Sequence, residues 1–363
     1  MILYQLFPYL VLLLLTVVIP KFFQKTDIKI LFVIFVVFGG CCYGVGWDYY
    51  NYTNAILSRG WFVERMEFFP RQLAILAGDL NSPQLFFFVN SFVVVLLYFF
   101  TIQKKSINPA ISILVFLCLP IFFLSSINIL RYAAAMAVLF FAHRYAEERH
   151  WLLYLGFVVI AFFTHKASIF GVLVTPFFFK KVKIPLLLNI TIFVGCFVFS
   201  QVSSFSTYLS SIFTYLGNWT GGIEELSDYG QRYIEGSTGR GFSRTPYIYA
   251  FINVLNFVNY HKLTNNNTNE QVSRYITLFN IGCSVMFLMS FDSIFGSRMA
   301  QPFLAFALLL IPYYFKNKND VYCYVISAVL VFVFFFQLSI PGYHSDFIGR
   351  HNCYLPYRLF FFQ

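Results

Sequence analysis

The sequence predicts an all-α membrane protein in which about twelve helices cross a bilayer. Of its 363 residues, 59% are hydrophobic and 11% are charged, whereas soluble domains carry about 25% charged residues. Mean hydropathy is +0.70, and apolar runs of roughly 15–20 residues recur along the chain, close to the length of a spanning helix. We therefore expect a single integral membrane domain over residues 1–363.

The apolar runs give the expected order of the spans. The first run lacks a basic stretch before it and a small-residue cleavage site after it, so we expect a span rather than a signal peptide. The runs on either side of His165 are short, which indicates tilted, broken or re-entrant helices, and Phe68–Leu80 is expected as a further re-entrant or interfacial helix. The expected spans are Tyr4–Ile19, Ile28–Tyr43, Leu85–Ile102, Ala110–Leu124, Leu130–Ala142, Trp151–Phe163, Ala167–Phe179, Pro185–Val202, Tyr247–Tyr260, Tyr275–Phe291, Arg298–Phe315 and Val321–Ser339.

Lysine and arginine divide between the two sides that these spans define. Eleven of the twelve lysines, among them Lys104 and Lys180, fall on one side, and ten of the thirteen arginines fall on the other. The positive-inside rule makes the lysine side cytoplasmic and places both termini outside. Arginine binds phosphate and carboxylate through paired hydrogen bonds, so the outer arginines are expected to bind an anionic ligand or to pair with carboxylates of the protein itself.

The net charge of +10 is spread over many loops, and no Walker or Rossmann glycine pattern occurs, so nucleic acid and nucleotides are not expected partners. The seven cysteines show no metal-ligand spacing and are expected to pack as small apolar residues.

Two longer outer segments are expected. Residues 44–83 form an outer loop or re-entrant segment in which glycines lie beside Trp47, Asp48 and Tyr52. Aromatic faces stack on sugar rings and a carboxylate accepts hydroxyl protons, although an interfacial aromatic belt would give the same composition. Residues 203–245 form a large periplasmic loop whose glycines, with Arg244 near its end, indicate a mobile lid.

Two stretches place cations among residues that are otherwise typical of spanning helix. Arg131 precedes Tyr-Ala-Ala-Ala-Met-Ala, and His165-Lys166 separates two apolar runs. A charge at membrane depth costs about 3 kcal/mol or more, so it needs a counter-charge, either a carboxylate of this protein or an anionic ligand. The alternatives are an arginine that extends to the interface and a histidine buried for packing.

Several motifs resemble, in order, those of EpsG-like proteins, which are polysaccharide polymerases of the Wzy type. The stretch Gly44-Val-Gly-Trp-Asp48-Tyr-Tyr-Asn-Tyr52 is similar to the family's G-x-D-x-x-x-Y signature. The elements that resemble later family motifs are Glu67-Phe-Phe-Pro70, Arg131-Tyr-Ala-Ala-Ala-Met-Ala137, Phe163-Thr-His165-Lys-Ala-Ser168, Gly296-Ser-Arg298 and Leu355-Pro356-Tyr357. The family often has an arginine where this chain has Cys41-Cys42-Tyr43, so a contact from that corner would fall to Arg59 or another outer arginine.

The resemblance implies an enzyme of the bacterial inner membrane, with a GT-C-like bundle of helices and an active site facing the periplasm. It implies transfer of a growing O-antigen, capsule or exopolysaccharide chain from undecaprenyl diphosphate to the non-reducing end of another lipid-linked repeat unit. The implied partners are that lipid-linked glycan, membrane lipid and a Wzz-type chain-length regulator. No metal or other cofactor is implied, because arginines can neutralise the diphosphate.

This chemistry assigns expected roles to individual residues. Arg131 and Arg298, assisted by Lys166 and Arg244, would bind the diphosphate and stabilise its developing charge. Sugar contacts are expected from Trp47, Tyr52 and Tyr357. The attacking sugar hydroxyl needs a general base, for which the candidates are His165, Asp48 and Glu67, and the sequence does not decide among them.

Three alternative functions remain at this point. An O-antigen ligase would share the chemistry and act on finished chains. A lipid-linked glycan flippase or another transporter would favour charges in mid-span and inverted repeats, and no internal repeat is found. A membrane acyltransferase could use His165 as its base but would need an acyl donor entering from the inner side.

Overall fold

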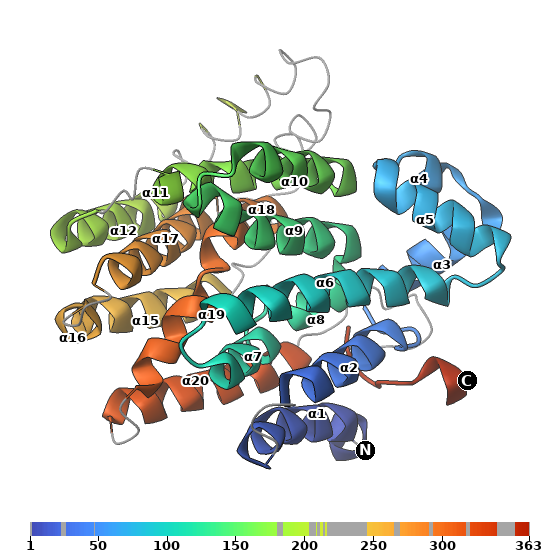
Figure 1. The fold of residues 1–363 in the computed structure, drawn as a ribbon, viewed down its shortest axis with the longest axis horizontal. Helices are drawn as coiled ribbons and strands as arrows, with labels where there is room; N and C mark the ends of the chain where they lie inside the picture. Colours follow the sequence, from blue (N-terminus) through green and yellow to red (C-terminus); the bar gives the residue numbers. More distant parts are fainter. Residues whose placement is uncertain are drawn as a thin grey trace. The chain divides into compact units, whose positions relative to one another are not determined.

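The structure is a computed structural model and is predominantly helical (Figure 1). It describes residues 2–22, 27–46, 48–179, 184–202, 245–264, 269–289, 293–316, 320–339 and 353–362, together with positions 208, 211, 212 and 215. Within these residues there is no β-strand, and an isolated antiparallel bridge joins Cys42 to Leu359. The predicted all-α class is confirmed over this part of the chain.

The chain forms two compact units, and the second is inserted in the sequence of the first. The first unit is Met1–Thr175 with Ala307–Gln363, and the second is Pro176–Phe306. The helices of the first unit are α1 (Ile2–Phe22), α2 (Asp27–Gly40), α3 (Tyr49–Ser58), α4 (Trp61–Glu64), α5 (Phe68–Asp79), α6 (Gln84–Lys105), α7 (Pro109–Cys118), α8 (Phe123–Asn128), α9 (Leu130–Glu147), α10 (Trp151–Thr164), η1 (Lys166–Val174), α19 (Ala307–Leu310), η2 (Ile311–Phe315), α20 (Val321–Leu338) and η3 (Phe360–Phe362). After α11 (Thr175–Phe179), the second unit contains α12 (Leu186–Ser200), α15 (Thr245–Val258), α16 (Tyr260–Thr264), α17 (Asn269–Leu288) and α18 (Ser293–Leu304).

Each predicted span falls largely on helix, but the helices differ in length. Four helical segments of the described residues are long and apolar enough to cross a membrane, namely Gln5–Phe22, Gln84–Lys105, Phe295–Phe315 and Val321–Leu338. Shorter apolar helices account for most of the other predicted spans. The predicted span Ala110–Leu124 is interrupted, because α7 ends at Cys118 and α8 begins at Phe123. These apolar helices mark the chain as a membrane protein.

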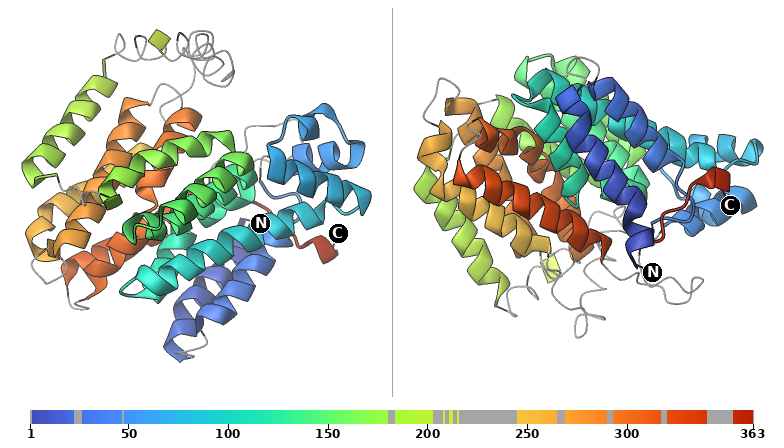
Figure 2. Two further views of the ribbon diagram at one scale, coloured as in Figure 1. Left: turned by 45° about the horizontal axis from the view of Figure 1, so that its top comes forward. Right: turned by 90° about the horizontal axis from the view of Figure 1, so that it is seen from below.

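The first unit is organised around a row of helices. In Figures 1 and 2, α2, α6, α9 and α10 lie side by side in this order, and α1 packs on α2 and α7. The start of α9 is rich in buried alanines, which allows α6 and α10 to approach its backbone closely. Aromatic rings fill the space between α2, α7 and α8, with the centroids of Phe35 and Phe123 4.7 Å apart.

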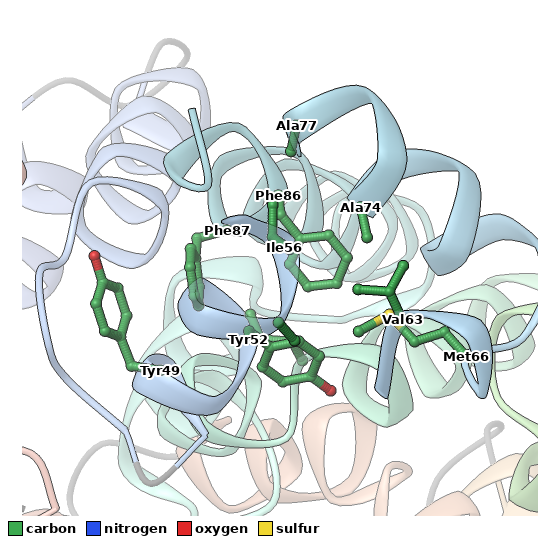
Figure 3. Packing of buried hydrophobic residues seen from close by; sticks show 11 residues of the cluster. Tyr49, Tyr52, Ile56, Val63, Met66, Ala74, Ala77, Phe86 and Phe87 are labelled. Atoms are coloured by element: carbon green, nitrogen blue, oxygen red, sulfur yellow. The ribbon is translucent and has the colours of Figure 1, made fainter. Parts of the chain in front are cut away.

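The segment predicted as an outer loop or re-entrant element is a compact group of three short helices. Apart from Trp47, residues 44–83 are described, and α3, α4 and α5 pack together against the first turns of α6 (Figure 3). The ring of Tyr52 stacks on Phe86 and that of Tyr49 on Phe87. Gly78 on α5 allows the close approach of α3, because a Cβ at this position would lie 2.9 Å from the carbonyl oxygen of Ile56.

The C-terminal segment 353–362 returns to the end of α2. Backbone bonds run from Tyr43 N–H to Arg358 and from Phe360 N–H to Cys41, each 2.8 Å long. The hydroxyl of Tyr357 donates to the carbonyl of Phe38 at 2.8 Å, and the two rings stack. This pairing fixes the loop that leads from α2 into α3.

A buried amide network joins three helices of the second unit. Asn189 on α12, Asn253 on α15 and Asn280 on α17 are each 0% exposed. The Asn253 amide donates to the Asn280 carbonyl at 2.8 Å, and the Asn280 amide donates to the side-chain and backbone oxygens of Asn189 at 3.0 Å. Side-chain amides join helices in this way where no water is present to satisfy them.

Candidate functional site

Arg131 lies in the first turn of α9, at a break in the helix. Ile129, two residues before Arg131, has φ −111° and ψ 63°, which ends α8 and begins α9 without a side-chain cap. The first amide groups of a helix have no partner within the helix, and its N-terminus carries positive partial charge. A cation here is therefore unfavourable unless an anion lies beside it, and the Arg131 side chain is only 17% exposed.

The anion beside Arg131 is Glu67. Arg131 Nη1 donates to Glu67 Oε2 at 2.6 Å, and Arg131 Nε donates to the Tyr52 hydroxyl at 2.9 Å. The guanidinium also lies over the ring of Phe62, 5.6 Å from its centroid. One of the two predicted counter-charges, a carboxylate of this protein, is therefore present beside Arg131. The planar group is thereby fixed in orientation by two different side chains.

Both oxygens of Glu67 are engaged, although its side chain is only 6% exposed. Oε2 binds Arg131, and Oε1 accepts the backbone N–H of Lys166 at 3.1 Å. Glu67 is itself the N-cap residue of α5, where negative charge is favourable. The carboxylate thus joins the N-termini of α5, α9 and η1.

His165 lies between α10 and η1, as the C-cap of one and the N-cap of the other. Its Nδ1 accepts the backbone N–H of Ala167 at 3.2 Å, and the same nitrogen is 3.9 Å from Glu67 Oε1. The residue is 4% exposed, and its ring packs edge-on against Tyr132. The predicted break near His165 is thus confirmed as a helix boundary.

Asp48 and Tyr52 connect this cluster to the signature stretch. Asp48 is the N-cap residue of α3, and its carbonyl accepts the N–H of Tyr52 one turn later at 2.9 Å. Burial raises the pKa of the Tyr52 hydroxyl, and the Arg131 guanidinium acts in the opposite direction. Because the shift is upward, the phenol stays protonated at neutral pH and the hydroxyl accepts from Arg131 as a neutral group.

Gly46 shows why the signature begins with glycine. Its φ is +94°, a conformation that residues with a Cβ rarely adopt, and a Cβ would lie 2.8 Å from the carbonyl oxygen of Ile127. The same glycine donates its N–H to Cys353 at 2.9 Å. The loop before α3 therefore lies directly against the end of α8, and this contact brings Asp48 and Tyr52 toward the start of α9.

Positive partial charge from several helix ends collects in this cluster. The N-termini of α5, α9 and η1 meet at Glu67, and each contributes positive partial charge. Arg131 and Lys166 carry two positive charges and Glu67 and Asp48 two negative ones, and Lys166 is exposed. Among the described residues, no group of three or more His, Cys, Asp or Glu side chains could hold a metal ion.

The structure brings together Asp48, Tyr52, Glu67, Arg131, His165 and Lys166 from the predicted set. Tyr52 is 3% exposed and its hydroxyl accepts from Arg131, and its contact with a sugar stays a prediction. Tyr357 stacks on Phe38 in the C-terminal segment. Arg298 belongs to the second unit, on α18, and Trp47 and Arg244 lie outside the described residues.

Two further members of the site were not anticipated. Phe62 lies under the Arg131 guanidinium, and the N–H of Ala167 binds His165. Nothing in the sequence distinguishes Phe62 from the many other aromatic residues of this chain. A sequence also does not indicate which backbone N–H group will bind a side chain. Arg59, expected to substitute for a missing arginine, forms an exposed ion pair with Asp79.

Comparison with known proteins places these residues in a family. The family model described as the EpsG family matches residues 25–359. This range contains every member of the site described above. No curated protein and no solved structure matches the chain.

Proposed function

This chain belongs to the EpsG family of polysaccharide polymerases, and we propose that it joins lipid-linked oligosaccharide repeat units at the outer face of the bacterial inner membrane. The donor is a growing glycan on undecaprenyl diphosphate, and the acceptor is the non-reducing end of another lipid-linked repeat. The product is an O-antigen, capsule or exopolysaccharide chain. Its length is set with a chain-length regulator of the Wzz type.

The reaction is a displacement at the anomeric carbon of the donor sugar. An acceptor hydroxyl oxygen forms the new glycosidic bond while the bond from carbon to the diphosphate oxygen breaks, so the configuration inverts. Undecaprenyl diphosphate leaves with the bonding electron pair, and the hydroxyl proton passes to a general base. Negative charge grows on the leaving diphosphate, and stabilising that charge is the main task of the site.

Arg131 is the residue we assign to the diphosphate. Glu67 and Tyr52 hold its guanidinium at the start of α9, and the helix N-termini around it favour negative charge. Lys166 provides a second, exposed cation in the same cluster. A preorganised cation of this kind loses little energy in reorganisation as charge develops.

The base is assigned to Asp48. Glu67 already accepts from Arg131 and from Lys166 N–H, and proton uptake would weaken both bonds. Asp48 lies at the start of α3, where its charge acts on the Tyr52 hydroxyl, and Tyr52 connects it to Arg131. Asp48→Asn should reduce turnover by roughly 10²–10⁴-fold.

The proposal includes the predicted topology. The chain crosses the membrane about twelve times in a GT-C-like bundle, with both termini and the Arg131 cluster at the periplasmic side. Residues 203–245, predicted as a large loop on that side, lie for the most part outside the described residues. Lys104 and Lys180 then face the cytoplasm.

The observation that carries the proposal is the Arg131 guanidinium fixed by Glu67 and Tyr52. The test is polymerisation of undecaprenyl-diphosphate-linked repeats by purified protein in liposomes, resolved as a ladder of glycans. The intact protein should give a ladder, and Arg131→Ala should leave single repeats. Arg65→Ala is the matched control, because Arg65 is an exposed arginine that stacks on Trp61. Transfer of finished chains to lipid A core without a ladder would instead make the protein a ligase.

A further inference from the structure

We infer that His165 is a positioning residue that acts through its neutral, Nε2-protonated form, rather than the general base of the reaction. The inference deepens the proposed function and rests on it for the turnover measurements alone. It concerns how the start of η1 is held, and through η1 how Glu67 and Arg131 are oriented.

The hydrogen bond at Nδ1 fixes the protonation of the ring. Ala167 N–H donates to His165 Nδ1 at 3.2 Å, so this nitrogen must present a lone pair. A neutral imidazole carries its single proton on the other nitrogen, which is then Nε2. In this tautomer Nε2 donates and Nδ1 is occupied, so neither nitrogen is ready to take a proton from a sugar hydroxyl.

The geometry at Glu67 agrees with this assignment. The distance from His165 Nδ1 to Glu67 Oε1 is 3.9 Å, longer than a hydrogen bond between nitrogen and oxygen. The same Oε1 instead accepts the N–H of Lys166. An Nδ1-protonated histidine would have to donate to Glu67 and lose the bond from Ala167.

His165 therefore acts as a helix cap. Its backbone has φ −160° and ψ 122°, the extended conformation usual for an N-cap residue, and its side chain accepts from the second residue of η1. The cap fixes the first turn of η1, which directs the Lys166 N–H at Glu67 Oε1. Glu67 in turn holds Arg131 through Oε2.

Three substitutions at His165 distinguish a capping role from a role as general base. Asparagine places an oxygen near the position of Nδ1 and is among the best N-cap residues, but it takes up no proton at neutral pH. Glutamine places an amide near Nε2 and caps less well, and alanine does neither. We expect His165→Asn to keep turnover within about threefold of the intact protein. His165→Gln and His165→Ala should lose about tenfold, which is the loss that a missing cap of about 1.4 kcal/mol produces.

A base would give a different pattern. If His165 accepts the proton, all three variants, including His165→Asn, should fall by roughly 10²–10⁴-fold, and that result would overturn the inference. Turnover retained by His165→Gln alone would overturn it too, since Nε2 and not the cap would then be the group that matters. In each case substrate KM is measured beside kcat, and folded protein is quantified by size-exclusion chromatography.

A spectroscopic measurement tests the assignment without relying on the reaction. In protein labelled with ¹⁵N-histidine and reconstituted in lipid nanodiscs, His165 should show an unprotonated Nδ1 and a protonated Nε2. Its signals are identified by their absence from His165→Asn. A protonated Nδ1 would overturn the inference even if polymerisation is observed. An intact protein that forms no polymer but shows the expected tautomer would refute the proposed function and leave the cap in place.

Discussion

Glu67 and Arg131 are 64 residues apart in the sequence and form an ion pair with Nη1 and Oε2 2.6 Å apart. The side chains are 6% and 17% exposed, so removing one partner leaves the other charge poorly solvated. Arg131→Met and Glu67→Gln should each lower the free energy of unfolding by about 3 kcal/mol. Thermal unfolding in detergent measures the change.

The double variant Arg131→Met with Glu67→Gln provides the control for that pair. Because neither charge remains, the double variant should lose less stability than the two single variants together. The difference, which is the coupling energy, should be about 1–3 kcal/mol. Polymerisation should stay absent, since the diphosphate contact is lost. Strictly additive losses would contradict an ion pair between the two residues.

Tyr52→Phe removes the second partner of Arg131. The ring stays packed on Phe86, but Arg131 Nε loses the hydroxyl that accepts its hydrogen bond at 2.9 Å. We expect a loss of stability of about 1–2 kcal/mol and slower polymerisation with little change in KM for the acceptor. Tyr324→Phe, at an exposed tyrosine of α20, is the comparison and should behave like the intact protein. A larger effect on KM than on kcat would indicate that Tyr52 contacts the sugar.

Gly46→Ala should destabilise the protein. The new Cβ would lie 2.8 Å from the Ile127 carbonyl oxygen, on a backbone whose φ is +94°, and we expect a cost of about 1–3 kcal/mol. Gly156→Ala is the matched control, because no atom lies within 4 Å of a Cβ at that position in α10. Alanine inside a helix should leave stability unchanged or raise it by up to about 1 kcal/mol. Equal melting temperatures for the two variants would refute the close contact at Ile127.

Asn280→Leu tests the amide network of the second unit. Leucine has the same branching as asparagine, although it is larger, and removes the bonds to Asn253 and Asn189, so buried amides lose partners at a cost of about 1–3 kcal/mol. Thr191→Val on α12 is the control, because the Thr191 hydroxyl is exposed and bonds only within its own helix turn. Unfolding followed by circular dichroism in detergent distinguishes the two. An Asn280→Leu protein as stable as Thr191→Val would show that the amide network makes no net contribution to the stability of the folded protein.

The topology has its own test. In a cysteine-free background, Arg65→Cys should react from outside the cell with a membrane-impermeant maleimide, and Lys104→Cys should react only after the membrane is opened. Both positions are exposed in the structure, so lack of reaction reports on the membrane side. Labelling of position 104 from outside would reverse the proposed orientation.

The helices could be predicted from the sequence because apolar runs and their interruptions are local signals. The boundary at His165 and the first turn of α9 at Arg131 were visible in this way. The interruption between Cys118 and Phe123 was not, since both sides and the gap itself are apolar. The helix at Phe68–Asp79 was expected within Phe68–Leu80, but the two short helices before it were hidden, because a glycine-containing aromatic segment is equally compatible with a loop.

The site could be predicted only as a set of residue types. The charge of Arg131 demanded a counter-charge, but Glu67 is brought to it by the packing of α5 and α3 on α6, contacts that no local pattern records. The order of the motifs identified Glu67 as relevant and gave it a catalytic role. Its bonds to Arg131 and to the Lys166 N–H, the latter 99 residues away, show a carboxylate that joins three helix ends.

The C-terminal segment has a consequence for biosynthesis. Tyr43 and Cys41 bond to Arg358 and Phe360, so the loop that carries Asp48 cannot reach its final state until the ribosome has made residues more than 300 positions later. At about 5–20 residues per second, this delay is on the order of 15–60 seconds. During that time the start of the chain is already in the membrane with its aromatic residues unpaired. A nascent protein of this kind depends on insertase or chaperone contacts for its early helices, and a tag fused near residue 360 would interfere with assembly at the opposite end of the sequence.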